Sequence, residues 1–539
     1  MNKNLNTENP ESLQYTNKLL EITVLGGIKL EGLDRMRVTL KIALLGSSIP
    51  PVRHNLDLYN DTQSEKLIRK TAERLEIGTN LIAGSLAELT ESLEYYRIEQ
   101  LKAKEDQYKI KAKKLTEEEV RAAQAFLKEP NLMQRTNIEI GKSGIIGEES
   151  NRLLMYLIFT SRKLKQPLHV VSLGASGTGK THLQENVGEL IPTEDKIEIT
   201  TLSENAFYYF GQRELKNKLI LIEDLDGAES VLYPLRELQS KKQIRKTIAQ
   251  KNTKGETRTI HLVVEGPVSV SGCTTQENIY EDNANRSFLI YLDESKEQDQ
   301  KIMSYQRKIS AGKIDTDTQE QVKNLLQNTQ RILQPIKVIN PYAELLNIPE
   351  EVLKPRRTNN HYLQFIEAVT YYHQYQREQK HDEETGEIYI ETTLEDIAEA
   401  NKLLKEILLR KSDELTGACR NYFEKLKMYL IGQEEKTFTN REMSNKLRIP
   451  ITTIKRYHLD LYNSGYLRIS KKDKFGGYEY EIVSYEEYQK LKENITNILD
   501  KNLKHLEKNL QKIKQPTSPE PAQRQSGLSK QKKIKELQS

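Results

Sequence analysis

The 539-residue sequence predicts an α/β protein with a parallel central sheet, preceded by a small α+β domain and followed by a helical lid and a winged-helix domain. Three observations predict this fold. A glycine-rich loop joins an apolar strand to a helix within residues 168–187, and a second apolar strand, residues 219–222, ends in carboxylates. Near the C-terminus, two short helices precede two strands joined by a turn rich in lysine and glycine, the order of elements in a winged helix.

Composition narrows the class of protein. The two cysteines, Cys273 and Cys419, lie far apart, which excludes a disulfide framework or zinc ribbon and predicts a reducing, cytoplasmic location. No apolar run approaches the length of a membrane span, so we expect no membrane association. The 82 basic and 78 acidic residues give a net charge of +4, so any case for nucleic-acid binding must rest on local patches.

The chain divides into six predicted segments. They are a flexible N-terminus (1–18), a small α+β domain with a helical linker (19–128), the α/β core (129–300), a helical lid (301–411), the winged helix (412–490) and a helical to disordered basic tail (491–539).

In the N-terminal domain, apolar residues from Met36 to Ile42 alternate with Arg35, Arg37, Thr39 and Lys41, which predicts a strand with one apolar and one cationic face. The cationic face can meet nucleic acid or simply be solvated. Helices are expected from about Thr62 and Thr79, and a capping box at Thr116 predicts a further helix that ends before Pro130.

Residues 174–181 match the phosphate-loop pattern G-x-x-x-x-G-K-[ST] between a strand and a helix, the context that the pattern requires. Its backbone amides and the following helix N-terminus suit a phosphate chain. We expect Lys180 to reach the β- and γ-phosphates of ATP and Thr181 to hold Mg²⁺. The expected nucleotide-contacting residues here are Gly174, Ala175, Ser176, Gly177, Thr178, Gly179, Lys180, Thr181 and His182. A lone histidine such as His182 is more often a packing residue than a catalytic one.

Two later strand ends are predicted to face the same phosphates. Glu223 and Asp224 follow the strand 219–222, where one acid can support the metal and the other polarise the attacking water. Thr274 or Thr275 follows the strand 268–272 and is expected beside the γ-phosphate. Further strands are expected at 196–201 and 289–292, and helices at 153–159, 207–210 and 232–241.

A hairpin is predicted between the acidic strand and the next core strand. Residues 246–251 and 257–262 flank a turn at Lys254-Gly255, with Lys251 and Arg258 close to the tip. Such a tip is usually a solvated turn, but the position of this hairpin between two strands of the core favours contact with DNA. Arg286 precedes the last core strand and is either a surface ion-pair partner or a residue that reaches a neighbouring subunit's phosphate.

After a mostly helical stretch, 294–410, the winged helix offers a second candidate DNA surface. Its second helix is predicted to present Thr452, Thr453, Lys455, Arg456 and His458 to a major groove. The wing is predicted to place Lys471, Lys472 and Lys474 near a phosphate backbone. Many winged helices bind protein instead, and that alternative stays open.

Taken together, residues 140–370 resemble an AAA+ ATPase module. Ile146-Gly147-Glu148 matches the box that borders the adenine, and the order of the loop, the acidic strand, the threonines and Arg286 matches phosphate loop, metal-site acids, first sensor and arginine finger. The hairpin resembles the pre-sensor hairpin of minichromosome-maintenance and superfamily-three helicases. Residues 19–429 resemble the helicase half of primase–helicase proteins from bacterial mobile elements.

The resemblance implies a homo-oligomeric ring, such as a hexamer, that uses ATP and Mg²⁺ to translocate on single-stranded or forked DNA during replication of a mobile element, with any primase on another chain. The acidic pair departs from the usual Asp-Glu, so Glu223 takes the metal side and Asp224 the water side. Arg357, in preference to Arg356, is the expected second sensor. A regulatory or assembly ATPase (a helicase loader, transposition helper or origin-binding initiator) is the main alternative, and a defence or signalling ATPase a weaker one.

Overall fold

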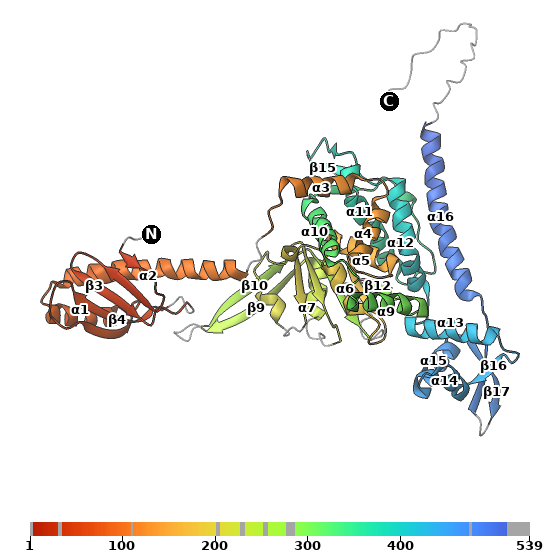
Figure 1. The fold of residues 1–539 in the computed structure, drawn as a ribbon, viewed down its shortest axis with the longest axis horizontal. Helices are drawn as coiled ribbons and strands as arrows, with labels where there is room; N and C mark the ends of the chain where they lie inside the picture. Colours follow the sequence, from red (N-terminus) through yellow and green to blue (C-terminus); the bar gives the residue numbers. More distant parts are fainter. Residues whose placement is uncertain are drawn as a thin grey trace, which may run out of the picture. The chain divides into compact units, whose positions relative to one another are not determined.

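A computed structural model describes residues 4–30, 35–108, 112–200, 205–226, 232–251, 257–275, 286–473 and 477–514 (Figure 1). The chain forms two compact units, Met1–Lys113 and Lys114–Ser539. None of the described helices is both long enough and apolar enough to cross a membrane.

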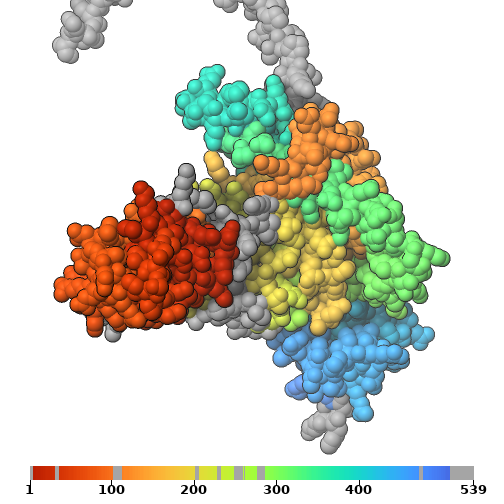
Figure 2. All heavy atoms as spheres, turned by 60° about the vertical axis from the view of Figure 1, so that its left-hand side comes forward, coloured from red at the N-terminus to blue at the C-terminus, as the bar shows by residue number. Residues whose placement is uncertain are grey.

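Unit 1 is an antiparallel sheet with two helices on one of its faces (Figure 1). The strands pair in sequence order: β1 (Leu5–Asn6), β2 (Ser12–Thr16), β3 (Leu20–Leu25), β4 (Arg37–Leu44) and β5 (Val52–Asp57). Helices α1 (Asp61–Leu75) and α2 (Thr79–Tyr108) follow the sheet. The predicted alternation in β4 is confirmed, because Val38, Leu40 and Ile42 are buried and Arg37 is exposed. In the space-filling view, unit 1 forms a rounded body (Figure 2, red and orange).

The predicted flexible N-terminus is wrong for the part that the structure describes. Strand β2 pairs with β3, and its Leu13 and Tyr15 are fully buried in the core that the sheet shares with α1 and α2. The Tyr15 hydroxyl also donates a hydrogen bond of 2.5 Å to Glu88 on α2. Burial of these two side chains holds residues 12–16 in the sheet despite the polar residues around them.

The boundary between the two units also differs from the predicted one. The capping box at Thr116 is confirmed, since Thr116 Oγ1 accepts from Glu119 N at 3.2 Å and Thr116 N donates to the Glu119 carboxylate at 2.9 Å. The helix that it starts, α3 (Glu117–Lys128), belongs to unit 2, where Ala123, Phe126 and Leu127 join the core. A boundary near Lys113 therefore replaces the one expected at residue 128.

Unit 2 is built on a five-stranded parallel sheet of order β12-β6-β11-β8-β7. Its strands are β6 (His169–Leu173), β7 (Lys196–Ile199), β8 (Lys218–Ile222), β11 (Val268–Thr274) and β12 (Phe288–Tyr291). Because the strands are parallel, the loops after β6, β8 and β11 all leave from one edge. Every residue of β6 and β11 is buried, which explains why these strands are nearly uniform apolar or small-residue runs.

The described connections of the sheet contain helices α6 (Lys180–Gly188) and α7 (Leu232–Lys241) and a hairpin. Helices α4 (Leu132–Lys142) and α5 (Glu149–Thr160) precede the first strand, β6. The predicted hairpin is present as β9 (Gln243–Lys251) and β10 (Thr257–Glu265), with Lys251 opposite Thr257. The helix expected at 207–210 is present as a short 3₁₀ helix, Ala206–Tyr209, in which Phe207 is buried.

The segment predicted to be a lid is mostly helical, as expected. Its helices are α9 (Lys296–Ser310), α10 (Thr316–Ile332), α11 (Pro355–Tyr372) and α12 (Leu394–Ser412). The sequence did not predict the small sheet of β13 (Lys337–Ile339), β15 (Ile388–Glu391) and β14 (Lys380–His381). These strands have two to four residues each, too short for a periodic pattern to show.

The last part contains the predicted helices and two predicted strands, in the same order: α13 (Gly417–Ile431), α14 (Asn440–Leu447), α15 (Ile451–Asn463), β17 (Leu467–Asp473) and β18 (Gly477–Ile482). A short strand that was not predicted, β16 (Thr437–Thr439), precedes α14 and pairs with β18. A long helix, α16 (Glu487–Lys514), then packs along α12 through Ile495, Leu499 and Leu506 (Figure 1). The start of α16 is tied to α13 because Arg420 and Lys427 both contact Glu487, at 2.8 and 2.6 Å.

One predicted DNA contact is wrong. His458 is fully buried among Tyr422, Phe438 and Tyr480, and its ring nitrogens lie 2.5 Å from Tyr422 Oη and 2.7 Å from Asn440 Oδ1. Burial lowers the pKa of His458 to about 4, so the ring is neutral near pH 7. His458 is therefore a core residue of this domain and is not presented to a groove.

Candidate nucleotide-binding site

The phosphate loop connects the carboxyl end of β6 to the first turn of α6. Gly174, Gly177 and Gly179 have φ values of 152, 82 and 91°, a region that side chains rarely adopt. Lys180 begins α6, and the helix N-terminus lies at the loop, where it favours an anion. The local backbone therefore matches the one that the loop pattern predicts.

The Lys180 side chain lies along this loop. Its Nζ donates to the carbonyl oxygens of Gly174 and Ala175 at 2.8 and 2.6 Å, and the residue is 7% exposed. These two bonds hold the amine over the loop, where a phosphate chain would bind.

Gln184 fastens α6 to the sheet, and sequence reasoning missed it. Its Nε2 donates to the Ile222 carbonyl at 3.0 Å, and its Oε1 accepts from Ser271 Oγ at 2.7 Å. One side chain thus connects the phosphate-loop helix to β8 and β11. The available signal was an amide beside Leu183 and Val187, on the buried face of the helix.

A cleft of about 410 Å³ brings most of the predicted catalytic residues together. Its lining is Ser176, Gly177, Gly179, Lys180, Thr181, His182, Glu223, Asp224, Cys273, Thr274 and Thr275. The two acids directly follow β8. The Glu223 backbone continues the sheet, since Glu223 N donates to Ile199 O of β7 at 3.1 Å, whereas the Asp224 side chain accepts a hydrogen bond from Asp226 N at 2.8 Å. The cleft therefore combines a phosphate loop with carboxylates and hydroxyls.

Asp226 is a second residue that sequence reasoning missed. Its carboxylate accepts hydrogen bonds from Thr274 Oγ1, from Thr275 N at 3.0 Å and from Thr275 Oγ1 at 2.7 Å. Burial acts to raise the pKa of Asp226, but these hydrogen bonds and the charge of Lys180 hold it below its usual value. Asp226 thereby fixes both threonine side chains at the tip of β11.

A lone histidine at this position was expected to be a packing residue, but His182 does not pack in the interior. The residue is exposed, and its carbonyl and ring nitrogens contact Asn186 Nδ2, at 2.7 Å for the carbonyl. The ring lies at the wall of the cleft because it follows Thr181 on the first turn of α6. His182 can therefore contact a bound nucleotide from the solvent side.

Gly147 lies in the loop before α5, outside the cleft lining. Arg152 Nη1 donates to the Ile145 and Gly147 carbonyls at 2.7 and 3.1 Å, and Gln298 Nε2 donates to Ile146 O at 2.9 Å. A methyl group at Gly147 would collide with the Gln298 amide. The segment that ends at Gln298 also passes the phosphate loop, with Leu292 next to Gly179. The Gly147 loop and the phosphate loop thus share one neighbouring segment.

The two predicted arginines lie at the other edge of the sheet. Phe288 pairs with Val170, so Arg286 lies level with the start of β6, about 20 Å along the strand from the phosphate loop. Its Nε donates to Ser240 Oγ at 3.1 Å. The structure does not bring Arg286 to the cleft of its own chain.

Arg357 also belongs to this edge. Burial and the charge of Arg357 together lower the pKa of Lys411 to about 8. Lys411 Nζ lies 3.2 Å from His361 Nδ1, and the His361 ring stacks on Phe288 at 5.4 Å. Since Phe288 begins β12, Arg357 does not join the chain's own cleft either.

The predicted DNA-contacting residues belong to the hairpin β9–β10 and to the segment from α15 to β17. Lys251 and Arg258 are on the paired strands β9 and β10 next to the hairpin tip, and Lys254 lies outside the described residues. On α15, Thr452, Lys455 and Arg456 are exposed and Thr453 is partly exposed. On β17, Lys471 and Lys472 are exposed, and Lys474 is outside the described residues.

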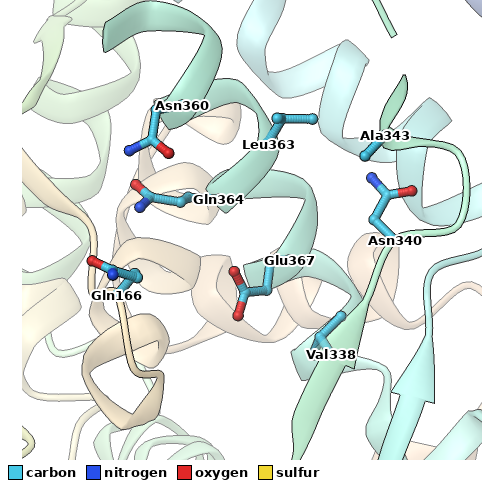
Figure 3. Close-up of a pocket in the computed structure, with 8 residues that line it drawn as sticks. All are labelled: Gln166, Val338, Asn340, Ala343, Asn360, Leu363, Gln364 and Glu367. Atoms are coloured by element: carbon cyan, nitrogen blue, oxygen red, sulfur yellow. The ribbon is translucent and has the colours of Figure 1, made fainter. Parts of the chain in front are cut away.

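A second hollow, of about 300 Å³, lies away from the phosphate loop, between α11, β13 and Gln166 (Figure 3). The Asn360, Gln364 and Glu367 side chains come from successive turns of α11, and burial raises the pKa of Glu367. No residue of the cleft lines this hollow, so it is a separate feature of the lid.

Of the comparisons with known proteins, the match to a family model supports the assignment of the core, and it does not extend to the flanking domains. A family model described as the MTBMA_p00010 P-loop domain matches residues 119–335. A search of curated proteins found no match. Solved structures with similarity include a full-length MCM homolog from Methanopyrus kandleri (11% identity, 76% of this chain and 75% of that chain, TM-score 0.36).

Two further structures are similar at the same low level. One is the structure of Drosophila ORC bound to DNA, with 12% identity, coverage of 73% of this chain and 94% of that chain, and a TM-score of 0.21. The other is the SCCmec type IV Cch active helicase, with 10% identity, coverage of 91% of this chain and 99% of that chain, and a TM-score of 0.22. These identities and TM-scores are too low to carry an argument. The family match and the loop geometry together define a P-loop NTPase core, a class that binds nucleotides.

Proposed function

We propose that this protein is an AAA+ ATPase that translocates on DNA as a ring of identical subunits, six by the family resemblance, in the cytoplasm during replication of a mobile element. One observation carries the proposal: a single cleft joins Lys180, Thr181, the acids after β8 and the threonines after β11. The hairpin β9–β10 enters the chain between that acidic strand and β11. Hydrolysis in the cleft can therefore move the hairpin through the strands that flank it.

The residues fit ATP and Mg²⁺. The Thr181 hydroxyl and the Glu223 carboxylate are oxygen donors on one cleft, the type of ligand that Mg²⁺ prefers, and Mg²⁺ when bound neutralises phosphate charge. Lys180 holds the β- and γ-phosphates in place of the two carbonyls that it now contacts. Asp224 orients the attacking water, and the threonines held by Asp226 contact the γ-phosphate.

The position of the two arginines supports the proposed ring. Arg286 lies at the edge of the sheet opposite the phosphate loop, so it serves a nucleotide only if a neighbouring subunit presents one. A cation delivered in this way stabilises the charge of the transferring phosphoryl group. Arg357, at the same edge, acts as the second sensor toward that nucleotide.

The winged helix supplies a second DNA contact in this proposal. Helix α15 exposes Thr452, Lys455 and Arg456 on its N-terminal half, the half that reads base edges when such a helix enters a major groove. Lys472, exposed on β17, is the residue that we assign to the phosphate backbone.

The same helix gives the alternative function its support. Leu459 and Tyr462, further along α15, are 56 and 44% exposed, and an apolar surface of this kind suits a protein partner. The alternative is a regulatory or assembly ATPase that docks a protein, such as a replication component, on α15. A loader, a transposition helper and an origin-binding initiator all belong to this class.

The hairpin variant Lys251→Ala/Lys254→Ala tests the translocase proposal. We expect unwinding of a forked duplex to fall at least tenfold, since each lysine lost removes a phosphate contact, while ATP hydrolysis without DNA stays within about twofold. Lys313→Ala, an exposed lysine in the turn after α9, is the matched control and should change neither activity. Unwinding that survives in the double variant would contradict the role of the hairpin.

A further inference from the structure

One face of the sheet of unit 1 is not covered by any of the helices or strands that the structure describes in this unit. The side chains on its other face, including Leu13, Ile22, Val38 and Leu40, pack against α1 and α2. Those two helices are the described helices of unit 1, and both contribute to this one core. On this face Gln14, Arg37 and Arg53 are exposed and Lys41 is partly exposed, whereas Thr23 between them is buried, at 5% exposure. The ATPase site does not use this face.

Register places these outward side chains in rows across the strands. One row runs through Gln14, Thr23, Lys41 and Arg53, because Gln14 pairs with Thr23, Thr23 with Lys41 and Lys41 with Arg53. The next row runs through Ser12, Leu25, Thr39 and Asn55, where Asn55 Nδ2 donates to Thr39 Oγ1 at 3.2 Å. Arg37, the first residue of β4, lies two residues before Thr39 on the same face.

Lys41 and Arg53 lie directly opposite each other in the first row. Like charges in opposite positions destabilise a sheet. Within the described residues of unit 1, neither Lys41 nor Arg53 forms a side-chain ion pair or hydrogen bond.

Acidic residues border the open face without neutralising this pair. Glu21 pairs with Ala43, and Asp57 pairs with Arg37. The Asp57 carboxylate already accepts from the backbone N–H groups of Met36 and Tyr59, at 2.8 and 3.2 Å. The centre of the face is thus cationic, with hydroxyl and amide groups around it.

We propose that this open face binds the phosphate backbone of nucleic acid. Lys and Arg contact phosphate oxygens through charge, and Thr, Asn and Gln side chains contact them through hydrogen bonds. The outward residues of β2 to β5 include no aromatic side chain, so bases have no surface on which to stack. Binding is accordingly independent of sequence and strongly dependent on salt. This contact is additional to the hairpin and the winged helix and does not require ATP hydrolysis.

The test compares Lys41→Gln/Arg53→Gln with the wild type in the full chain, without nucleotide. Fluorescence anisotropy with a labelled 30-nucleotide single strand, over a range of salt concentrations, gives the affinity and its salt dependence. We expect affinity at low salt to fall at least about fivefold, and the slope of log K against log salt to become shallower by about 1.4 for two lost phosphate contacts.

The matched control is Lys66→Gln/Lys70→Gln, which removes the same charge from exposed positions of α1 in the same unit. It should leave the slope unchanged. A slope equal to wild type in the Lys41/Arg53 variant overturns the proposal, as does an equal loss in the control, which would indicate a general charge effect. Loss of binding to phosphatidylserine vesicles but not to DNA also overturns it. The hairpin variant, measured in parallel, separates failure of this surface from failure of the translocase proposal.

Discussion

Asp224→Asn is expected to lower the rate of ATP hydrolysis at least about 100-fold while ATP binding changes less than about threefold. Asp224 lies on the cleft wall, and it is the acid assigned to the attacking water. A group that positions or activates a nucleophile contributes about 10²–10⁴ in rate, and an amide of the same shape cannot accept the proton. Steady-state hydrolysis and equilibrium binding of a fluorescent ATP analogue measure the two quantities.

The neighbouring acids serve as comparisons in the same experiment. Glu223→Gln should mainly raise the Mg²⁺ concentration needed for half-maximal hydrolysis, since Glu223 is assigned to the metal side. Asp226→Asn should lower hydrolysis about tenfold, because it weakens the hydrogen bonds that fix Thr274 and Thr275. If Glu223→Gln stops hydrolysis at saturating Mg²⁺ and Asp224→Asn does not, the two assignments are reversed.

Arg286→Ala is expected to reduce hydrolysis about 1,000-fold in a ring made only of that variant. The reason is that, in the proposed ring, Arg286 acts on the nucleotide of the next subunit, because it lies at the sheet edge opposite its own phosphate loop. Subunits with Lys180→Ala cannot hydrolyse ATP but keep the arginine. Mixing the two inactive variants should therefore restore part of the activity.

Restoration should depend on the mixing ratio and reach its maximum when both variants are present in comparable amounts. Hydrolysis is measured after subunit exchange, with size-exclusion chromatography to confirm that the subunits assemble. An Arg286→Ala variant that keeps full activity, or a mixture that stays inactive although it assembles, contradicts action between subunits.

The sequence predicts the core of unit 2 well because its signals are local. The phosphate loop needs glycine at positions with positive φ, and β8 needs an apolar run before its acids; both are visible within a few residues. The hairpin β9–β10, the helices α13 to α15 and the strands β17 and β18 are also close in sequence, so their order could be predicted, whereas the three-residue strand β16 was not.

Long-range packing decides what the sequence did not predict. Nothing within residues 12–16 shows that β2 pairs with β3 over α1 and α2, and nothing in α3 shows that its apolar face belongs to unit 2. Asp226 could be recognised only once β8 and β11 were adjacent, because its partners are 48 and 49 residues away.

His458 is the one error for which the sequence held a usable signal. Ile454 and Leu461 lie four residues before and three residues after it, which is the spacing of one helix face. Both are buried, so the histidine shares their face and not that of Lys455 and Arg456. The helix period would have separated the two faces.

The measurement that tests the translocase account most directly is steady-state ATP hydrolysis by the full chain alone, with single-stranded DNA and with a forked duplex, using Lys180→Ala as the blank. The account predicts turnover that rises several-fold with forked DNA and accompanies strand separation. Slow turnover that forks do not change, but that one particular duplex or protein alters, would contradict the account and favour the assembly ATPase.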